Sequence, residues 1–198
     1  MKPIRKIIGG LGNLMFKEAF IYTQMREGII SDLYVQSDKH WKKYAEEIRQ
    51  RFSENIGYDE RVAIHIRRGD YLQTNFYVNL WETDYYQKAL SFFPNEKFLI
   101  FCADRQNTSQ DEQDREWCYW FFRKLLPNGN FEVHKPCLEE TDDLNAMASC
   151  KGNIMANSSF SWWASFLNPN PNKKVICPKM WFKDGIQRCE LLDEWIKI

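Results

Sequence analysis

The residues best suited to chemistry lie in the run HIRRGD at residues 65–70, which follows an apolar stretch expected to be a strand at 62–66. In open α/β sheets ligands bind beyond the carboxyl ends of the strands, so these side chains are expected to face a cleft. Arg67 and Arg68 repel each other unless an anion or a carboxylate meets them, and guanidinium groups offer diphosphate oxygens paired donors in one plane. Asp70 can orient one of the two arginines. A solvated basic turn with a salt bridge is the alternative interpretation.

A second polar run, NSSF at residues 157–160, also follows a short apolar stretch, and it opens an expected helix. Free backbone N–H groups, hydroxyls and the positive end of the helix dipole meet at such a point, which is a general way to bind phosphate. Asn and Ser are also ordinary N-cap residues, so capping alone is the alternative. The two tryptophans at 162 and 163 are expected to pack in the core.

A glycine turn at residues 9–12 is the third feature, because glycine allows a sharp turn and a close backbone approach to a ligand. It is not a dinucleotide-binding GxGxxG motif, since Gly10 and Gly12 are followed by Asn13, Leu14 and Met15. Metal binding has little support, because His40, His65 and His134 lack HxxxH or HExxH spacing and no DxD triplet occurs. Arginines could supply the charge stabilisation that a metal gives elsewhere.

The composition excludes several classes of partner. Lys+Arg and Asp+Glu both number 27, so a formal net charge of +0 leaves no overall field that attracts nucleic acid or an anionic membrane. The six cysteines form no CxxC pair and read as buried free thiols of a reducing compartment. No apolar run approaches the ~18 residues of a spanning helix, and no signal peptide is recognised. We therefore expect a soluble, cytoplasmic protein.

Apolar strands alternate with helical stretches, which is typical of βαβ units on a mostly parallel sheet. Thr83 and Thr141 are expected to cap two of the helices, and a polar insertion is expected at 106–114. A boundary between two lobes is expected near 55–60. Strands are expected at 4–8, 62–66, 97–102, 131–134, 153–156 and 173–177, and helices at 14–27, 39–52, 84–93, 115–125, 142–150, 159–167 and 190–197.

Taken together, these runs resemble glycosyltransferase family 11, the α-1,2-fucosyltransferases. The likeness is carried by residues 9–16, 65–71, 153–171 and 178–182. It implies an α/β fold of the GT-B type with two Rossmann-like lobes and parallel sheets: a reduced N-terminal acceptor-side lobe at 1–58 and a GDP-sugar-binding lobe at 59–198. The implied activity is inverting transfer of L-fucose from GDP-L-fucose to a glycan hydroxyl, with no metal or other cofactor and no nucleic-acid partner.

The resemblance also implies roles for individual residues. Arg67 and Arg68 would contact the diphosphate, beside His65 and Asp70. Asp143 stands sixteen residues before Ser159, the spacing at which more distant fucosyltransferases carry a guanine-reading aspartate, and a carboxylate can accept from both N1–H and the N2 amine of guanine. The implied GDP-sugar-binding residues are Gly10, Gly12, Asn13, His65, Arg67, Arg68, Asp143, Asn157, Ser158, Ser159 and Phe160. The implied catalytic residues are Arg67, Arg68, Asp70 and Glu18.

Glu18 is a candidate general base, whereas Asp70 is preferred as a structural residue. The chain departs from the family pattern in two places, of which the second concerns the acceptor-binding lobe. The chain reads Cys102-Ala103-Asp104 where the family has Ser-Asp-Asp, and its glycine turn lies much closer to the arginine run than in the family. Another GDP-sugar as donor, and a GDP- or glycan-binding module without catalysis, stay open, as do the acceptor, the linkage position and any homo-oligomer.

Overall fold

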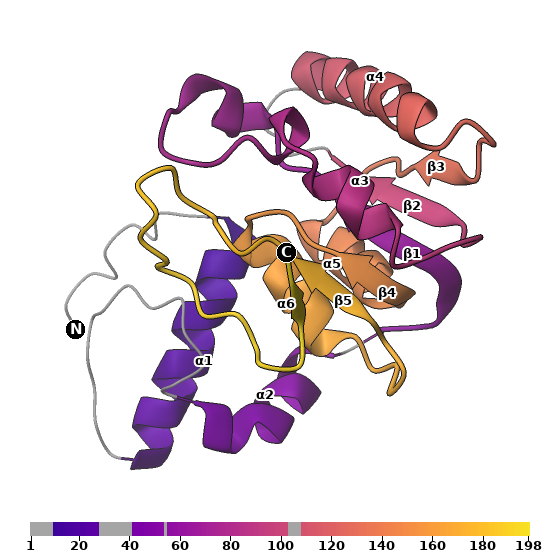
Figure 1. The fold of residues 1–198 in the computed structure, drawn as a ribbon. Helices are drawn as coiled ribbons and strands as arrows, with labels where there is room; N and C mark the ends of the chain where they lie inside the picture. The colour runs from indigo at the N-terminus through magenta and orange to yellow at the C-terminus, as the bar shows by residue number, and fades with distance from the viewer. Residues whose placement is uncertain (1–9, 28–40, 54, 103–107) are drawn as a thin grey trace.

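A parallel sheet of six strands forms the centre of the described chain (Figure 1). This computed structural model describes residues 10–27, 41–53, 55–102 and 108–198. The strands are β1 (Asp59–His65), β2 (Phe98–Phe101), β3 (Phe131–Val133), β4 (Cys150–Ile154), β5 (Val175–Cys177) and β6 (Ile196–Lys197). They lie in the order β3-β2-β1-β4-β5-β6, and each neighbouring pair is parallel. This is the strand order of Rossmann folds, so the predicted α/β class with a parallel sheet is confirmed.

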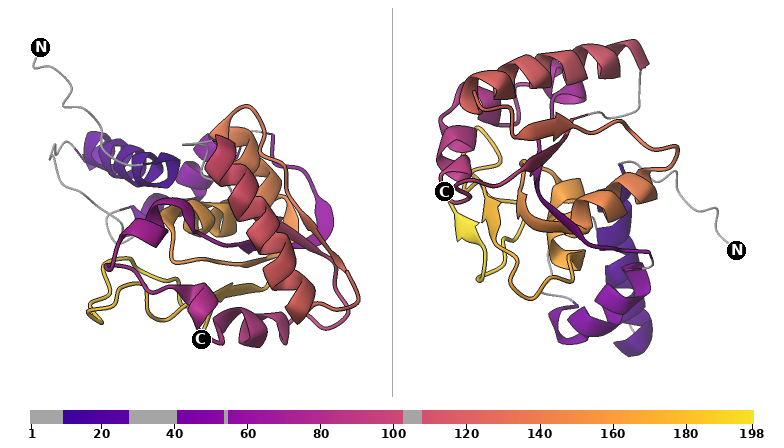
Figure 2. Two further views of the ribbon diagram at one scale, coloured as in Figure 1. Left: turned by 90° about the horizontal axis from the view of Figure 1, so that it is seen from above. Right: turned by 90° about the vertical axis from the view of Figure 1, so that its right-hand side faces the viewer.

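Helices cover both faces of the sheet. The helices are α1 (Leu11–Glu27), α2 (Ala45–Phe52), α3 (Tyr85–Leu90), α4 (Thr108–Leu125), α5 (Glu140–Ala148) and α6 (Ser159–Leu167). Short 3-10 turns are η2 (Lys42–Tyr44), η3 (Gly69–Gln73) and η4 (Leu80–Glu82). The helices α3 and α4 pack on one face, and α1, α2, α5 and α6 on the other, as the right-hand view of Figure 2 shows for α4 and α1.

The alternation of side chains along the strands separates two hydrophobic cores. In β1, Val62 and Ile64 point to the face of α3 and α4, whereas Ala63 points to the opposite face. In β2, Ile100 and Phe101 divide in the same way. Because every strand residue reverses direction, a fully apolar strand supplies both cores at once.

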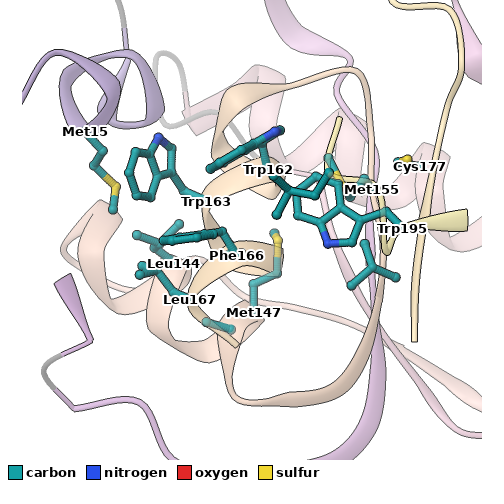
Figure 3. Close-up of a cluster of buried hydrophobic side chains, with 14 of the residues drawn as sticks. Met15, Leu144, Met147, Met155, Trp162, Trp163, Phe166, Leu167, Cys177 and Trp195 are labelled. Carbon is teal, nitrogen blue, oxygen red and sulfur yellow. The ribbon is translucent and has the colours of Figure 1, made fainter. Parts of the chain in front are cut away.

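Buried hydrophobic side chains join α1 and α6, and Figure 3 shows Met15 of α1 beside Trp163 of α6. The ring centroid of Phe16 lies 4.7 Å from that of Trp162 and 5.1 Å from that of Trp163, and Trp41 stacks on Trp163 at 5.4 Å. Both α6 tryptophans are fully buried, which confirms their predicted packing role. The described part of residues 1–58 therefore contributes helices to the core of the sheet. The predicted strand at 4–8, Gly9 and the predicted helix start at 39–40 with His40 lie outside the described residues.

Several predicted elements are corrected by the structure. The helix α4 begins at Thr108, inside the segment 106–114 that was expected to be a polar insertion. Asp111 in its first turn suits the positive end of the helix dipole. Glu139, rather than Thr141, is the N-cap residue of α5, and its side chain makes no capping hydrogen bond. Thr83 does accept a hydrogen bond from the N–H of Tyr85, at 3.2 Å, although the N-cap residue of α3 is Asp84.

The predicted final helix at 190–197 is wrong. Residues 196–197 form the edge strand β6, in which Ile196 pairs with Ile176 and Lys197 with Cys177. Leu192 and Trp195 lie three residues apart, a spacing that also suits one face of a helix, and both are buried in the structure. Pairing with the open edge of β5 satisfies backbone groups that a helix would leave there without partners.

None of the described helices combines the length and the apolar character needed to cross a membrane. All six cysteines are free, and Cys137 is the one that is not fully buried. The predicted buried free thiols are thus present in the structure.

The close approach of α1 to α6 at Gly12 gives a test by substitution. A Cβ atom at Gly12 would lie 2.5 Å from the carbonyl carbon of Ser159 and 2.7 Å from the nitrogen of Phe160, whereas a Cβ at Gly10 meets nothing within 4 Å. Gly12→Ala should lower the free energy of unfolding by about 1–3 kcal/mol, because α1 must move away from α6. Urea denaturation measures this change.

The matched control is Gly10→Ala, expected to change the unfolding free energy by no more than about 0.5 kcal/mol. Alanine ordinarily stabilises a helix relative to glycine by up to about 1 kcal/mol, so the sign of the effect at position 12 is informative. A Gly12→Ala protein as stable as the wild type, or more stable, would contradict the packing of α1 on α6.

Candidate functional site

A cavity of about 460 Å³ opens at the carboxyl ends of the strands. It lies where the strand order reverses between β1 and β4, which is where open α/β sheets bind their ligands. Its lining includes these residues expected from the sequence: Gly10, Gly12, Asn13, His65, Arg67, Asp70, Asp143, Asn157, Ser158, Ser159 and Phe160. Arg68 and Glu18 do not line it. The structure thus brings together most of the predicted site, from four separate parts of the chain.

Arg67 supplies the guanidinium group of the cavity. It lies two residues beyond the end of β1, and its Nη2 lies 2.9 Å from Oδ1 of Asp70. The arginine side chain is 23% exposed and the aspartate 49%, so the pair is open to solvent on one side. The same guanidinium lies 5.7 Å from the ring centroid of Tyr71. Asp70 therefore holds Arg67 in place, as the sequence suggested for one of the arginines.

Arg68 is placed differently from the sequence prediction, because its charge is already paired inside the protein. Its Nε lies 2.9 Å from Oδ1 of Asp114, and the two side chains are only 12% and 3% exposed. Its guanidinium carbon lies 3.8 Å from the ring centroid of Trp117 and 5.4 Å from that of Trp81. Consecutive residues leaving a strand point in opposite directions, so one arginine reaches the cavity and the other anchors the loop to α4.

Asp114 is a residue that the sequence analysis missed. Besides Arg68, it accepts a hydrogen bond from the backbone N–H of Gly69, at 3.2 Å from Oδ2. Gly69 has a φ of 31°, a left-handed conformation that glycine adopts without strain. The aspartate thus holds the loop that carries Arg67. Nothing in the polar stretch around Asp114 distinguished it from its neighbours. The adjacent arginines indicated that one of them needs a carboxylate partner, but they did not indicate which carboxylate.

The start of α6 forms the opposite wall. Ser158 is the N-cap residue, and its Oγ accepts from the N–H of Phe160 at 3.3 Å. The hydroxyl of Ser159 donates to Oδ1 of Asn13 at 3.1 Å, which joins the start of α6 to the first turn of α1. Two helix N-termini therefore border one cavity, and the positive ends of their dipoles favour an anion between them.

Asn157 holds neighbouring loops together. Its side-chain amide donates to the carbonyl oxygens of Val78, at 2.9 Å, and Trp181, at 3.0 Å. The backbone carbonyl oxygen of Asn157 accepts a hydrogen bond from the hydroxyl of Tyr71 at 2.9 Å. The residue lines the cavity, as predicted, but its amide N–H groups shape the wall rather than face a ligand.

His65 is a buried, uncharged part of the cavity wall. Burial, and secondarily the charge of Arg67, lowers the pKa of its imidazole from 6.5 to about 3. Its Nδ1 has no hydrogen-bond partner among the described residues. At neutral pH this side chain can form a hydrogen bond with a ligand, but it is too weak a base to act as a general base.

Asp143 lies at the β3 end of the cavity. Its Oδ1 accepts from the backbone N–H of Cys137, at 2.9 Å, and lies 2.8 Å from Nε2 of His134. The ring of His134 packs on Phe101 with centroids 4.5 Å apart. This corner places a carboxylate beside an aromatic surface, an arrangement suited to a planar base with N–H donors.

The same corner brings together three groups able to bind a metal ion, which the sequence did not suggest. Donor atoms of His134, Cys137 and Asp143 lie within 4.8 Å of one another. The separation of 2.8 Å between Nε2 and Oδ1 is that of a hydrogen bond. A hydrogen-bonded pair therefore accounts for the arrangement, and the metal-free site stays a prediction.

Glu18 lies away from the cavity. Its carboxylate forms an ion pair with Arg51 at 2.9 Å, and both side chains are about half exposed. The residue lies two turns into α1 rather than at its start. Its ion pair with Arg51 connects α1 to α2. Nothing in this placement supports the predicted role as general base.

Besides Phe101, four aromatic residues that the sequence did not assign to the site line the cavity: Tyr71, Tyr77, Trp181 and Phe182. The rings of Tyr71 and Tyr77 stack with centroids 4.0 Å apart and planes within 3°. Tyr77 forms an isolated antiparallel bridge with Phe182. We call these four residues the aromatic wall. They come from two segments far apart in the sequence, one after β1 and one after β5, and no spacing in the sequence could reveal that these meet.

Comparison with known proteins identifies a family and two relatives of this chain. The family described as Glycosyl transferase family 11 matches residues 16–198. The O-antigen biosynthesis glycosyltransferase WbnK of Escherichia coli is 32% identical over 143 residues, which cover 69% of this chain and 44% of that relative. An alpha-1,2-colitosyltransferase of Escherichia coli is 25% identical over 186 residues, which cover 82% of this chain and 60% of that relative. The chain thus spans about half the length of these relatives.

The buried pair between Arg68 and Asp114 leads to a stability prediction. Asp114→Ala should lower the free energy of unfolding by about 3–5 kcal/mol, because it leaves a buried guanidinium without its carboxylate. Urea denaturation measures the loss. Asp193→Ala is the matched control, since that carboxylate is 95% exposed and lies 3.7 Å from Lys197; removal of such a pair should cost no more than about 1 kcal/mol. Equal losses in the two variants would show that Arg68 is not held as described.

Proposed function

We propose that this chain, which belongs to glycosyl transferase family 11, transfers a sugar from a GDP-linked donor to a hydroxyl group of a glycan. L-fucose is the first expectation for the sugar, and a galactoside is the expected acceptor, with α-1,2 linkage. The family match over residues 16–198 supports the class of reaction. The site geometry supports the kind of donor.

The observation that carries the proposal is the convergence of Arg67 with two helix N-termini on one cavity. A diphosphate carries negative charge on oxygens that accept hydrogen bonds. A guanidinium group supplies positive charge and N–H donors, and the backbone N–H groups of a first helical turn supply further donors. The chain has no net charge, so this local arrangement, and not an overall field, accounts for anion binding.

Asp143 supports guanine as the base. Guanine presents two adjacent donors, N1–H and the N2 amine, to which one carboxylate can bind, whereas uracil and adenine lack that pair. The side chain of Asp143 is 12% exposed, and the residue lines the cavity. A base without these N–H donors would leave the buried carboxylate without hydrogen bonds. Such a site therefore discriminates against that base more strongly than an apolar pocket could.

The proposed reaction is a single displacement. An oxygen of the acceptor attacks the anomeric carbon, the bond from that carbon to the diphosphate oxygen breaks, and GDP leaves from the opposite face, which inverts the configuration. The acceptor proton passes to a general base or to solvent. Arg67 stabilises the charge that grows on the departing diphosphate, a contribution of about 3 kcal/mol for one main donor. No metal ion is needed for this step in the proposal.

Two alternatives have specific support. One relative is named for transfer of colitose, which favours a donor sugar other than fucose as the second candidate. The matched regions cover 44% and 60% of the two relatives, which is the reason to keep a GDP- or glycan-binding module without catalysis as the third. Release of GDP from several GDP-sugars, with and without a galactoside acceptor, separates all three.

The central test of the proposed function is Arg67→Ala. Transfer from GDP-L-fucose to a galactoside in the presence of EDTA should fall by on the order of 100-fold or more, because the growing diphosphate charge loses its main donor. Turnover is followed by GDP release. Arg123→Ala is the matched control: this arginine is exposed on α4 and donates to the carbonyl of Pro127, so its loss should leave turnover unchanged.

A folded Arg67→Ala protein that keeps wild-type turnover would refute the role of this arginine. A wild-type protein that binds GDP but releases none from any donor would favour the binding module. Loss of activity in EDTA that added Mg²⁺ or Mn²⁺ restores would overturn the metal-independent mechanism.

A further inference from the structure

We infer that the donor lies across the strand ends in one direction, with its sugar at the β5 end, where the buried indole N–H of Trp181 donates to a hydroxyl group of the sugar. The inference rests on the proposed function, because it takes a GDP-linked sugar as the ligand. It adds a specificity-determining residue and a position for each part of the donor.

The strand order sets the sequence of groups along the cavity. From β3 to β5 the cavity-lining residues at or beyond the ends of successive strands are His134, Phe101 with Cys102, Arg67, Ser158 and Trp181. Neighbouring strands lie about 4.8 Å apart, so the five strand ends span about 19 Å. The residues that line the cavity therefore form a strip along these strand ends, and different loops form its two ends.

The chemistry of the strip changes from one end to the other. The β3 end carries the carboxylate of Asp143 against His134, and the middle carries Arg67 and the start of α6. The β5 end carries Trp181 and Phe182 of the aromatic wall, and Tyr77 reaches it through its bridge to Phe182. In a nucleoside diphosphate sugar the diphosphate lies between the base and the sugar. If the base occupies the carboxylate end and the diphosphate the middle, the sugar falls against the aromatic wall, which suits the apolar face of a sugar ring.

Trp181 provides the polar contact at that end. The residue is 2% exposed, lines the cavity, and its Nε1 has no hydrogen-bond partner among the described residues. Its backbone is held at the carbonyl oxygen, which accepts from the side-chain amide of Asn157 and from the N–H of Val78, each at 3.0 Å. An indole N–H can only donate, so the group that satisfies it must be an acceptor. A sugar hydroxyl has the required oxygen and lies within the strip.

Three other buried tryptophans also have an Nε1 without a partner in the described part of the chain: Trp41, Trp163 and Trp195. They differ from Trp181 because they pack among aromatic rings of the core and do not line the cavity. Trp195, for example, lies 5.4 Å from Trp162, ring centroid to ring centroid. These side chains supply a matched control for loss of a buried indole N–H.

The test compares Trp181→Phe with Trp195→Phe. Both variants keep an aromatic ring and remove one N–H, and thermal unfolding reports whether each is folded. For Trp181→Phe the Kd of GDP should stay within about 2-fold of the wild-type value, whereas the Kd of GDP-L-fucose should rise by about 10-fold, the value of one hydrogen bond. For Trp195→Phe both constants should stay within about 2-fold. Isothermal titration calorimetry in EDTA measures all four.

The outcomes separate this inference from the function on which it rests. Equal weakening of GDP and GDP-L-fucose by Trp181→Phe would place the N–H against the diphosphate and overturn the inference while the proposed function stands. No effect on either ligand would overturn it as well. Failure of the wild-type protein to bind GDP or any GDP-sugar would refute the proposed function itself.

A second measurement needs no variant and decides the matter if Trp181→Phe does not fold. Analogues of GDP-L-fucose that each lack one ring hydroxyl of the sugar are titrated into the wild-type protein. Removal of the hydroxyl that meets Trp181 should weaken binding by about 10-fold or more, because a buried N–H is then left without a partner. Equal affinity for all the analogues would overturn the inference.

Discussion

The reversal of strand order between β1 and β4 is the constraint on which the site depends. Crossover connections between parallel strands are right-handed, so a chain that adds β2 and β3 on one side of β1 places α3 and α4 on one face of the sheet. When it returns to add β4 and β5 on the other side, α6 falls on the opposite face. The segments that leave β1 and β4 therefore diverge, and a crevice opens between neighbouring strand ends. In this chain Arg67 fills one side of that crevice and the start of α6 fills the other.

The division of labour between two adjacent arginines follows from burial and pairing. Arg68 lies against Trp117 and is matched by Asp114, so it contributes stability and holds its loop, but it adds no charge to the cavity. Arg67 is paired with a half-exposed carboxylate, whose effect solvent reduces. Most of its charge is therefore available to a ligand. The close contact at Gly12 brings a second helix N-terminus to the same place, which strengthens the field without any further charged side chain.

Much of the fold and part of the site were open to prediction. The alternation of apolar strands with helical runs gave the parallel α/β class, and α6 was predicted at its observed bounds because Ser158 caps an uninterrupted apolar run. Residues at strand ends were correctly expected to meet, since parallel strands share one carboxyl edge. Arg68 and Glu18 were misplaced because their partners, Asp114 and Arg51, lie 46 and 33 residues away in sequence. The aromatic wall depends on loop contacts that leave no periodic pattern.

The central claim is that one pyrophosphate is bound between Arg67 and the first turn of α6, and a crystal structure of the chain with GDP measures this most directly. The predicted result places diphosphate oxygens within hydrogen-bond distance of the Arg67 guanidinium and of backbone N–H groups at the start of α6, with the base against Asp143. A structure with GDP bound elsewhere, or with its diphosphate in bulk solvent and Arg67 turned away, would contradict it.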